Sequence, residues 1–158
     1  MNTIYQTLKD EHDRHRELLA AIADTSGDTQ ERRTKWDTFY NEVSAHAAAE
    51  EETLYSKLIA KEDGQPAGRH SVAEHKELDD LMAELNEIEF SSPGWLTKFK
   101  SLKDRYEHHI EEEENDIFPE AKELVGKDKN GQMAEAFEER KDAELELVDE
   151  KAEGGLDH

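Results

Sequence analysis

The sequence predicts an all-α protein in which four amphipathic helices form an up-down-up-down bundle. Apolar residues recur at helical spacing over long stretches, which is typical of helices with one buried face. A histidine four residues before a glutamate occurs in VSAHAAAEEETLY and again, 63 residues later, in YEHHIEEEENDIFP. The connections between the expected helices are short, which favours antiparallel neighbours. The repeat therefore predicts two halves related by a pseudo-twofold axis.

The first helix is expected to run from Thr3 to about Asp24, because Thr3 and Gln6 have the spacing of a capping box. Its apolar positions define the face that would enter the core. Two histidines fall on this face, so it is not purely hydrophobic. The residues of the inward face are Ile4, Leu8, His12, His15, Leu19 and Ile22.

The second helix follows a turn, TSGD at 25–28, and is expected to extend to about Ala60. Asp28 and Glu31 have capping-box spacing at its start. The stretch EDGQPAG at 62–68 combines two glycines with a proline, which disfavours a continuous helix. We therefore interpret it as the linker between the two halves of the bundle.

The third helix is expected from about Arg69 to Glu89, where the sequence FSSPG interrupts the periodic pattern. Ser92 is placed as the N-cap of the fourth helix, and Pro93 as its first helical residue. The fourth helix is expected to end near Val125, because a glycine follows and glycine commonly terminates helices.

The bundle domain is assigned to residues 1–125, and a C-terminal extension to residues 126–158. Within the extension, KDKNG at 127–131 indicates a polar turn. The segment 132–150 has an apolar pattern that permits a short fifth helix, although glutamates interrupt it. Residues 151–158 are expected to form a flexible tail.

The composition limits the classes of function. The chain of 158 residues has a formal net charge of −21 and lacks a basic cluster that would follow a phosphate backbone. Nucleic acids and anionic membranes are therefore not expected as partners. The absence of cysteine excludes thiolate metal ligands and disulfides. Neither a long apolar run nor a signal-peptide pattern is recognisable, so the expected location is the cytoplasm.

Each copy of the repeated motif brings a histidine and a glutamate onto the core-facing side of a helix, since residues four positions apart project from one side. Another histidine lies 34 residues before each motif, so both halves carry the same three polar residues at the same spacing. The six candidate metal ligands are His12, His46 and Glu50 in the first half, and His75, His109 and Glu113 in the second.

Buried polar groups of this kind need partners, because their desolvation costs about 2–7 kcal/mol when they are unpaired. Six ligands in two equal halves favour two cations with the glutamates as bridges, and nitrogen and oxygen donors favour iron or manganese over structural zinc. The alternatives are hydrogen-bonded core histidines and glutamates in solvated acidic runs. Four neighbouring glutamates are interpreted as outer acceptors or solvated charges: Glu11, Glu51, Glu74 and Glu114.

The order H, HxxxE, H, HxxxE resembles the hemerythrin-like, or HHE cation-binding, family over roughly residues 1–125. HAAAEEETLYSKL and HHIEEEENDIFPEA are similar to the most recognisable stretches of that family. The resemblance implies a non-haem centre of two iron ions with an oxo or hydroxo bridge. It also implies an open coordination position for dioxygen, peroxide or nitric oxide, and it favours iron over manganese or zinc.

The chain departs from oxygen-carrying hemerythrins in two helices. Their third helix carries HxxxH, whereas Asp79 lies four residues after His75 here. Their last helix carries HxxxxD, whereas Glu113 lies four residues after His109 and Glu114 five residues after it. Fewer imidazoles and a longer carboxylate argue against reversible oxygen carriage and leave redox, sensing or iron-handling roles open.

His15 breaks the symmetry of the two halves, because the corresponding residue in the second half is Leu78. Three roles are open for His15: a fifth metal ligand, a proton donor beside a bound oxygen species, or a structural histidine. Four functional hypotheses follow. They are a di-iron protein that binds oxygen or nitrogen oxides, an iron or oxygen sensor, a peroxidase-like or catalase-like enzyme, and a metal-free acidic adaptor.

Overall fold

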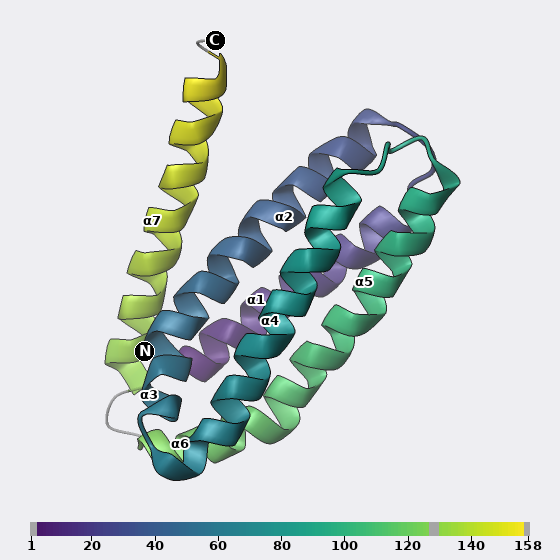
Figure 1. The fold of residues 1–158 in the computed structure, drawn as a ribbon. Coiled ribbons are helices and arrows are strands. Elements are labelled where there is room, and N and C mark those ends of the chain that lie inside the picture. Colours follow the sequence, from purple (N-terminus) through teal and green to yellow (C-terminus); the bar gives the residue numbers. More distant parts are fainter. Residues whose placement is uncertain (1–2, 127–129, 157–158) are drawn as a thin grey trace.

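The structure, a computed structural model, describes residues 3–126 and 130–156. These residues form helices and contain no β-strand. None of the helices in these ranges is long and apolar enough to cross a membrane. Four long helices form an up-down-up-down bundle (Figure 1), which confirms the predicted fold class. They are α1 (Ile4–Ala23), α2 (Gln30–Glu50), α4 (Gln65–Asn86) and α5 (Pro93–Glu112).

The starts of the first two helices are set by threonine caps. Thr3 precedes α1 and accepts a hydrogen bond from a backbone N–H of the first turn, as predicted. The predicted cap of α2 is wrong by one residue, because Thr29 accepts the hydrogen bond from the N–H of Arg32. The carboxylate of Asp28, which was expected to cap this helix, forms a two-pronged ion pair with Arg33 instead.

Two π-helical turns follow the repeated motifs, and the periodic pattern of the sequence does not predict them. One continues α2 and the other continues α5, so the predicted helix ends near Ala60 and Val125 are right although the helices are not regular. A π turn has hydrogen bonds between residues five positions apart, is wider than an α-helical turn, and so changes which side chains share a face. The segments are η1 (Glu51–Tyr55) with α3 (Ser56–Ile59), and η3 (Glu113–Ile117) with α6 (Phe118–Val125).

The linker between the two halves is shorter than predicted. Only η2 (Glu62–Gly64), a short 3-10 turn, separates α3 from α4. Helix α4 already begins at Gln65, four residues before the expected Arg69. Pro66 lies in its first turn, where a missing N–H costs no hydrogen bond. The proline that was interpreted as a break therefore helps to start the helix.

The second half differs from the prediction mainly at one boundary. Helix α4 ends at Asn86 and not at Glu89. Ser92 caps α5 and Pro93 opens it, as predicted. Gly126 follows α6 with a φ of 92°, a conformation that glycine adopts without strain, and thus ends the helix as expected.

The C-terminal extension forms one long helix, α7 (Asn130–Leu156), which packs against α1 and α2 and diverges from them toward its end (Figure 1). The fifth helix expected over 132–150 is confirmed, and it is longer at both ends. The predicted polar turn is wrong for residues 130–131 and the predicted tail for residues 151–156, because all of these are helical. The rest of that turn and tail, 127–129 and 157–158, lies outside the described residues.

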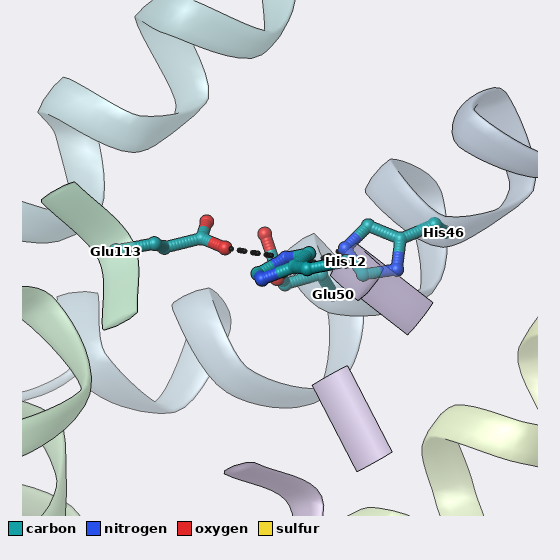
Figure 2. Close-up of side chains that lie close together, drawn as sticks. All are labelled: His12, His46, Glu50 and Glu113. Atoms are coloured by element: carbon teal, nitrogen blue, oxygen red, sulfur yellow. Dashed lines mark ion pairs between the residues drawn. The ribbon is translucent and has the colours of Figure 1, made fainter. Parts of the chain in front are cut away.

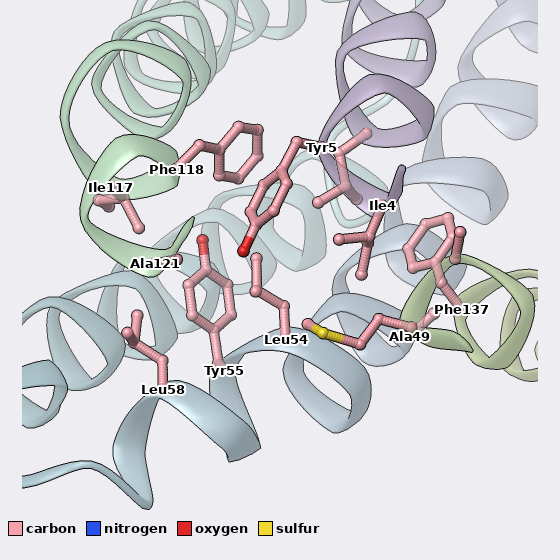
Figure 3. Packing of buried hydrophobic residues seen from close by; sticks show 13 residues of the cluster. Ile4, Tyr5, Ala49, Leu54, Tyr55, Leu58, Ile117, Phe118, Ala121 and Phe137 are labelled. Carbon is pink, nitrogen blue, oxygen red and sulfur yellow. The ribbon is translucent and has the colours of Figure 1, made fainter. Parts of the chain in front are cut away.

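The hydrophobic core consists of two clusters, and the predicted ligands lie where each long helix passes from one cluster to the other. Along α1, for example, His12 falls between Leu8 of one cluster and Leu19 of the other. Figure 3 shows the cluster that includes α7. Its larger members are Ile4, Tyr5, Leu54, Tyr55, Leu58, Ile117, Phe118, Met133 and Phe137. The other includes Leu19, Trp36, Phe39, Leu78, Met82, Trp95, Phe99 and Tyr106.

Replacement of Phe137 by alanine is expected to lower the free energy of unfolding by about 3–5 kcal/mol, because it leaves a cavity in a packed core. Phe137 is fully buried and lies near Ile4 and Ala49 in Figure 3. Urea denaturation measures the effect. Leu147→Ala is the control on the same helix, since Leu147 is 48% exposed. Similar small losses for both variants would show that α7 does not belong to the core.

Candidate metal centre

All six predicted ligand side chains lie in one buried cluster in the middle of the bundle. They form two groups of four, and within each group the nearest ligand atoms lie within 4.8 Å of one another. Two glutamates belong to both groups, as the bridges of a two-metal centre would. The first group is His12, His46, Glu50 and Glu113 (Figure 2), and the second is Glu50, His75, His109 and Glu113.

The two shared carboxylates divide their oxygens between the groups. Each glutamate directs one oxygen to a histidine of the first group and the other oxygen to a histidine of the second group. This is the arrangement by which a carboxylate bridges two cations. The four Nε2-to-oxygen contacts are His46 with Glu50 Oε2 (3.3 Å), His75 with Glu50 Oε1 (3.2 Å), His12 with Glu113 Oε1 (3.1 Å) and His109 with Glu113 Oε2 (3.2 Å).

Each of the four histidines directs its other ring nitrogen, Nδ1, to a glutamate outside the cluster. These are the four glutamates that were interpreted as outer acceptors or solvated charges. An ionised carboxylate can only accept, so each Nδ1 must donate, and in a neutral imidazole Nε2 then carries a lone pair. The pairs are His12 with Glu114 (3.2 Å), His46 with Glu11 (2.9 Å), His75 with Glu51 (2.9 Å) and His109 with Glu74 (3.0 Å).

When the histidines are neutral, hydrogen-bond acceptors therefore face one another at the centre of the cluster. Among the described residues, His12 Nε2, both oxygens of Glu50 and Glu113 Oε1 are buried without a hydrogen-bond partner. A buried unsatisfied polar atom costs about 1–3 kcal/mol. Divalent cations bound by nitrogen and oxygen donors remove this cost, so the residues fit a centre of two metal ions.

Protons compete with metal ions for these histidines. Burial is the largest single effect and lowers the pKa of a histidine, but here the hydrogen bonds and charges of the glutamates together outweigh it. They raise the pKa of His46 and His109 to about 10 and the pKa of His75 to about 9. Metal binding must therefore displace protons.

The carboxylate of Glu113 is ionised in this environment. Burial alone would raise its pKa, but the nearby charges of His109 and His12 hold the pKa well below its usual range. Glu113 thus carries a negative charge that a bound cation would neutralise.

A tyrosine hydroxyl that was not among the predicted site residues also reaches the cluster. Tyr55 is fully buried at the end of η1, and its hydroxyl donates a hydrogen bond to Glu113. It lies five residues after Glu50, which is the hydrogen-bond spacing of a π turn, whereas a regular α-helix would place it about 140° away. The sequence contains one indication of this role. The residue that corresponds to Tyr55 in the second half of the repeat is Phe118, which lacks the hydroxyl.

His15 lies beside the cluster but belongs to neither group of four. Its ring centroid is 5.1 Å from that of His46, and its Nδ1 is 2.7 Å from the hydroxyl of Tyr106. Burial, with the neighbouring histidines, holds the pKa of His15 well below its usual value, so its imidazole is neutral. Burial also raises the pKa of Tyr106 well above its usual value. The pair is therefore neutral and keeps exchangeable protons next to the cluster.

The other described histidines lie at the surface, as predicted. The side chain of His70 is 51% exposed and pairs with Glu74 and Glu112. The side chain of His108 is 73% exposed. His158, which was assigned to the tail, lies outside the described residues.

A small cavity of about 10 Å³ adjoins the four ligand histidines, which is about the room that one water-sized molecule needs. Its apolar wall includes Val43, Leu78, Met82 and Ile110. Asp79 also lines the cavity, at the position where oxygen-carrying hemerythrins have a further histidine. The cavity thus has space for a small molecule, and fewer imidazoles line it than in the oxygen-carrying hemerythrins.

The metal-free protein is expected to lose stability as the pH rises from about 7 to about 10. His46, His75 and His109 have raised pKa values of about 9 to 10 in the fold. Their stabilising effect is complete below the unfolded value of about 6.5 and is lost as the pH passes the folded values. The urea midpoint of metal-free protein at about pH 7 and pH 9.5 measures it. A midpoint that rises with pH would contradict the assignment.

Comparisons with known proteins show to which family the chain is similar. The family model described as Hemerythrin HHE cation binding domain matches residues 3–121. The uncharacterized protein Rv2633c of Mycobacterium tuberculosis is 28% identical over 116 residues, which are 73% of this chain and 70% of that protein. A DNA nickase of Nostoc sp. is 25% identical over 124 residues, 78% of this chain. The match spans only 35% of the Nostoc protein.

A solved structure extends the similarity to the whole fold. It is the crystal structure of a hemerythrin HHE cation binding domain-containing protein from Mycobacterium kansasii, a homolog of Rv2633c. It superimposes with a TM-score of 0.86 at 25% identity and covers 96% of this chain and 92% of that chain. The family match includes both repeated motifs and both preceding histidines, and the chain therefore belongs to the hemerythrin HHE cation-binding domain family.

Proposed function

We propose that this protein is a non-haem di-iron protein that binds dioxygen, peroxide or nitric oxide. The observation that carries the proposal is the sharing of Glu50 and Glu113 between two groups of four buried side chains. A single ion would need only one such group. Two equal groups, joined by carboxylates that direct one oxygen to each, suit a pair of ions.

The donor atoms support iron as the metal. Four imidazole nitrogens and the oxygens of two carboxylates, without sulfur, suit iron or manganese, and paired carboxylates and histidines in helix bundles commonly hold two ions of these metals. Iron bound there would supply one-electron redox chemistry and affinity for small oxygen and nitrogen oxides. The outer glutamates orient each imidazole toward the centre by accepting from Nδ1.

The cavity beside the histidines supports a small ligand. Its volume of about 10 Å³ admits a diatomic molecule or a peroxide more readily than an organic substrate. Its apolar wall of Val43, Leu78, Met82 and Ile110 excludes bulk water from the ligand. Asp79 takes the place of an imidazole there, which favours redox or iron-handling roles over reversible oxygen carriage.

Peroxide reduction is a second candidate function, and the His15–Tyr106 hydrogen bond favours it. His15 is buried against His46 and keeps a proton at neutral pH, because its imidazole is neutral and Tyr106 is not ionised. A neutral imidazole is a weak acid by itself, but His15 can accept the Tyr106 proton at Nδ1 while it gives its Nε2 proton to a reduced oxygen atom, and so can relay a proton. The hydrogen bond to Tyr106 supports a role of His15 in proton transfer.

Other hypotheses have less support. A metal or oxygen sensor would be favoured by a weakly packed fifth helix that orders on metal binding, but α7 places Met133 and Phe137 in the hydrophobic core. The DNA nickase activity of the Nostoc relative is not proposed for this chain. The matched part is 35% of that protein, and a net charge of −21 disfavours contact with a phosphate backbone.

Metal content tests the proposed function directly. Wild-type protein incubated anaerobically with Fe(II) is expected to retain about two ions per chain, and air should then produce the charge-transfer absorption of ferric iron. Glu113→Ala is expected to retain at most about one ion, because it removes a ligand of both positions. Glu111→Ala is the matched control, since Glu111 is an exposed residue of the same acidic run. Wild-type protein that retains no iron would refute the proposal.

A His15→Ala variant tests the second candidate function. If His15 donates a proton, peroxide turnover by the iron-loaded protein should fall about 100-fold while the iron content stays unchanged. Tyr106→Phe, which removes the hydroxyl that contacts His15, should give a smaller loss. Unchanged turnover would exclude the proton-donor role, and a loss of iron would instead assign His15 to the metal ligands.

A further inference from the structure

The outer glutamate of one ligand histidine is tied to helix α7. Glu11 accepts a hydrogen bond from His46 Nδ1 through Oε1 at 2.9 Å, and its Oε2 lies 2.6 Å from Nζ of Lys141. Both side chains are largely buried, with 13% exposure for Glu11 and 19% for Lys141. A lysine of the fifth helix therefore reaches a candidate metal ligand through a single carboxylate.

The second half of the site is held differently. Glu74, which lies 63 residues after Glu11 in the repeat, accepts from His109 Nδ1 at 3.0 Å. The further partner of Glu74 is the imidazole of His70, which belongs to the same helix and has a side chain that is 51% exposed. The two halves thus have equivalent ligands but unequal support for the carboxylates that orient them.

Glu114 is the other outer glutamate of the first group of four, because it accepts from His12, and it also pairs with a permanent cation. Arg16 donates to it at 2.8 Å, while the same carboxylate accepts from His12 Nδ1. Its counterpart at the second group of four is Glu51, which pairs with His75 and has a side chain that is 39% exposed. The first position therefore has the more firmly held surroundings, and α7 provides one of its two cations.

Helix α7 contacts the same half of the site a second time. The ring of Phe137 lies edge-on to the ring of His46, with 5.6 Å between their centroids. Phe137 and Lys141 are four residues apart and so project from one side of α7. This side of α7 therefore restrains both the imidazole of His46 and the carboxylate to which it donates.

A carboxylate orients a ligand histidine only while it is itself held in place. We propose that Lys141 is a positioning residue for the metal position of His12 and His46, and that α7 thereby sets the affinity of that position and not of the other. The inference rests on the two-metal centre proposed above. It adds that the two metal positions differ in affinity. Lys141 acts through Glu11 and does not contact the metal.

Two parent variants separate the positions. His109→Ala removes a ligand of the second position, and His12→Ala removes a ligand of the first. Cobalt(II) titration, followed by the visible absorption of the bound ion, measures the affinity of each parent. Adding Lys141→Met to the His109→Ala parent is expected to weaken binding about 10- to 100-fold. The same addition to the His12→Ala parent should leave the affinity unchanged, and Lys141→Arg should restore most of the loss.

Arg140→Met is the matched control. It removes a positive charge from the neighbouring residue of α7, but Arg140 pairs with Glu52 and Glu144, which are not among the four outer glutamates. It should leave the affinity unchanged in both parents. Circular dichroism and the urea midpoint verify that every variant is folded.

Three results would overturn the inference: no effect of Lys141→Met, an equal effect in both parents, or an equal effect of Arg140→Met. The last two would give α7 a general stabilising role. Failure of the proposed function is distinguishable, because the wild-type protein would then bind no cobalt or iron at all.

Discussion

Opposed lone pairs in the middle of the bundle are the constraint on which the rest of the structure depends. Four imidazole nitrogens face the oxygens of Glu50 and Glu113 in a layer that is buried from solvent. Apolar packing cannot satisfy these atoms, so the layer needs cations, either protons or metal ions. The two hydrophobic clusters that flank the layer exclude water and make that need stronger.

The acidic composition has a specific structural use near this layer. Four glutamates that resemble surface charges in the sequence each accept a hydrogen bond from a ligand histidine. Two of them, Glu11 and Glu114, are in turn paired with Lys141 and Arg16. The site therefore consists of successive shells of ionisable side chains. The two bridging carboxylates lie at the centre, the four imidazoles surround them, and the outer glutamates and their cations surround the imidazoles. Its polarity favours bound cations, in agreement with the description of the family.

The π-helical turns adapt regular helices to this site. Both begin at or next to the bridging glutamates, Glu50 and Glu113, in the two halves of the repeat. A π turn weakens the regular hydrogen-bond pattern and persists where it serves a local geometry. Here it allows Glu50 to face the centre, Glu51 to accept from His75, and Tyr55 to donate to Glu113. Regular α-helical spacing cannot bring all three to one side.

Much of the fold and the grouping of the six candidate ligands could be predicted from the sequence, because helical periodicity is a local property. The spacing of His46 with Glu50, repeated in His109 with Glu113, was sufficient to place these side chains on inward faces. The errors at Asp28 and Arg69 also have local causes, since neighbouring residues competed for the same cap and a proline fits either a break or a helix start.

The sequence by itself therefore determined the four helices, their buried faces and the identity of the residues that meet between them. Only the tertiary structure decided which oxygen faces which nitrogen, how Tyr55 reaches Glu113, and that Lys141 contacts Glu11 from 130 residues away. These contacts depend on the rotation of packed helices and on the register after each π turn. Neither leaves a periodic pattern in the sequence, because both arise from contacts between segments that are distant along the chain.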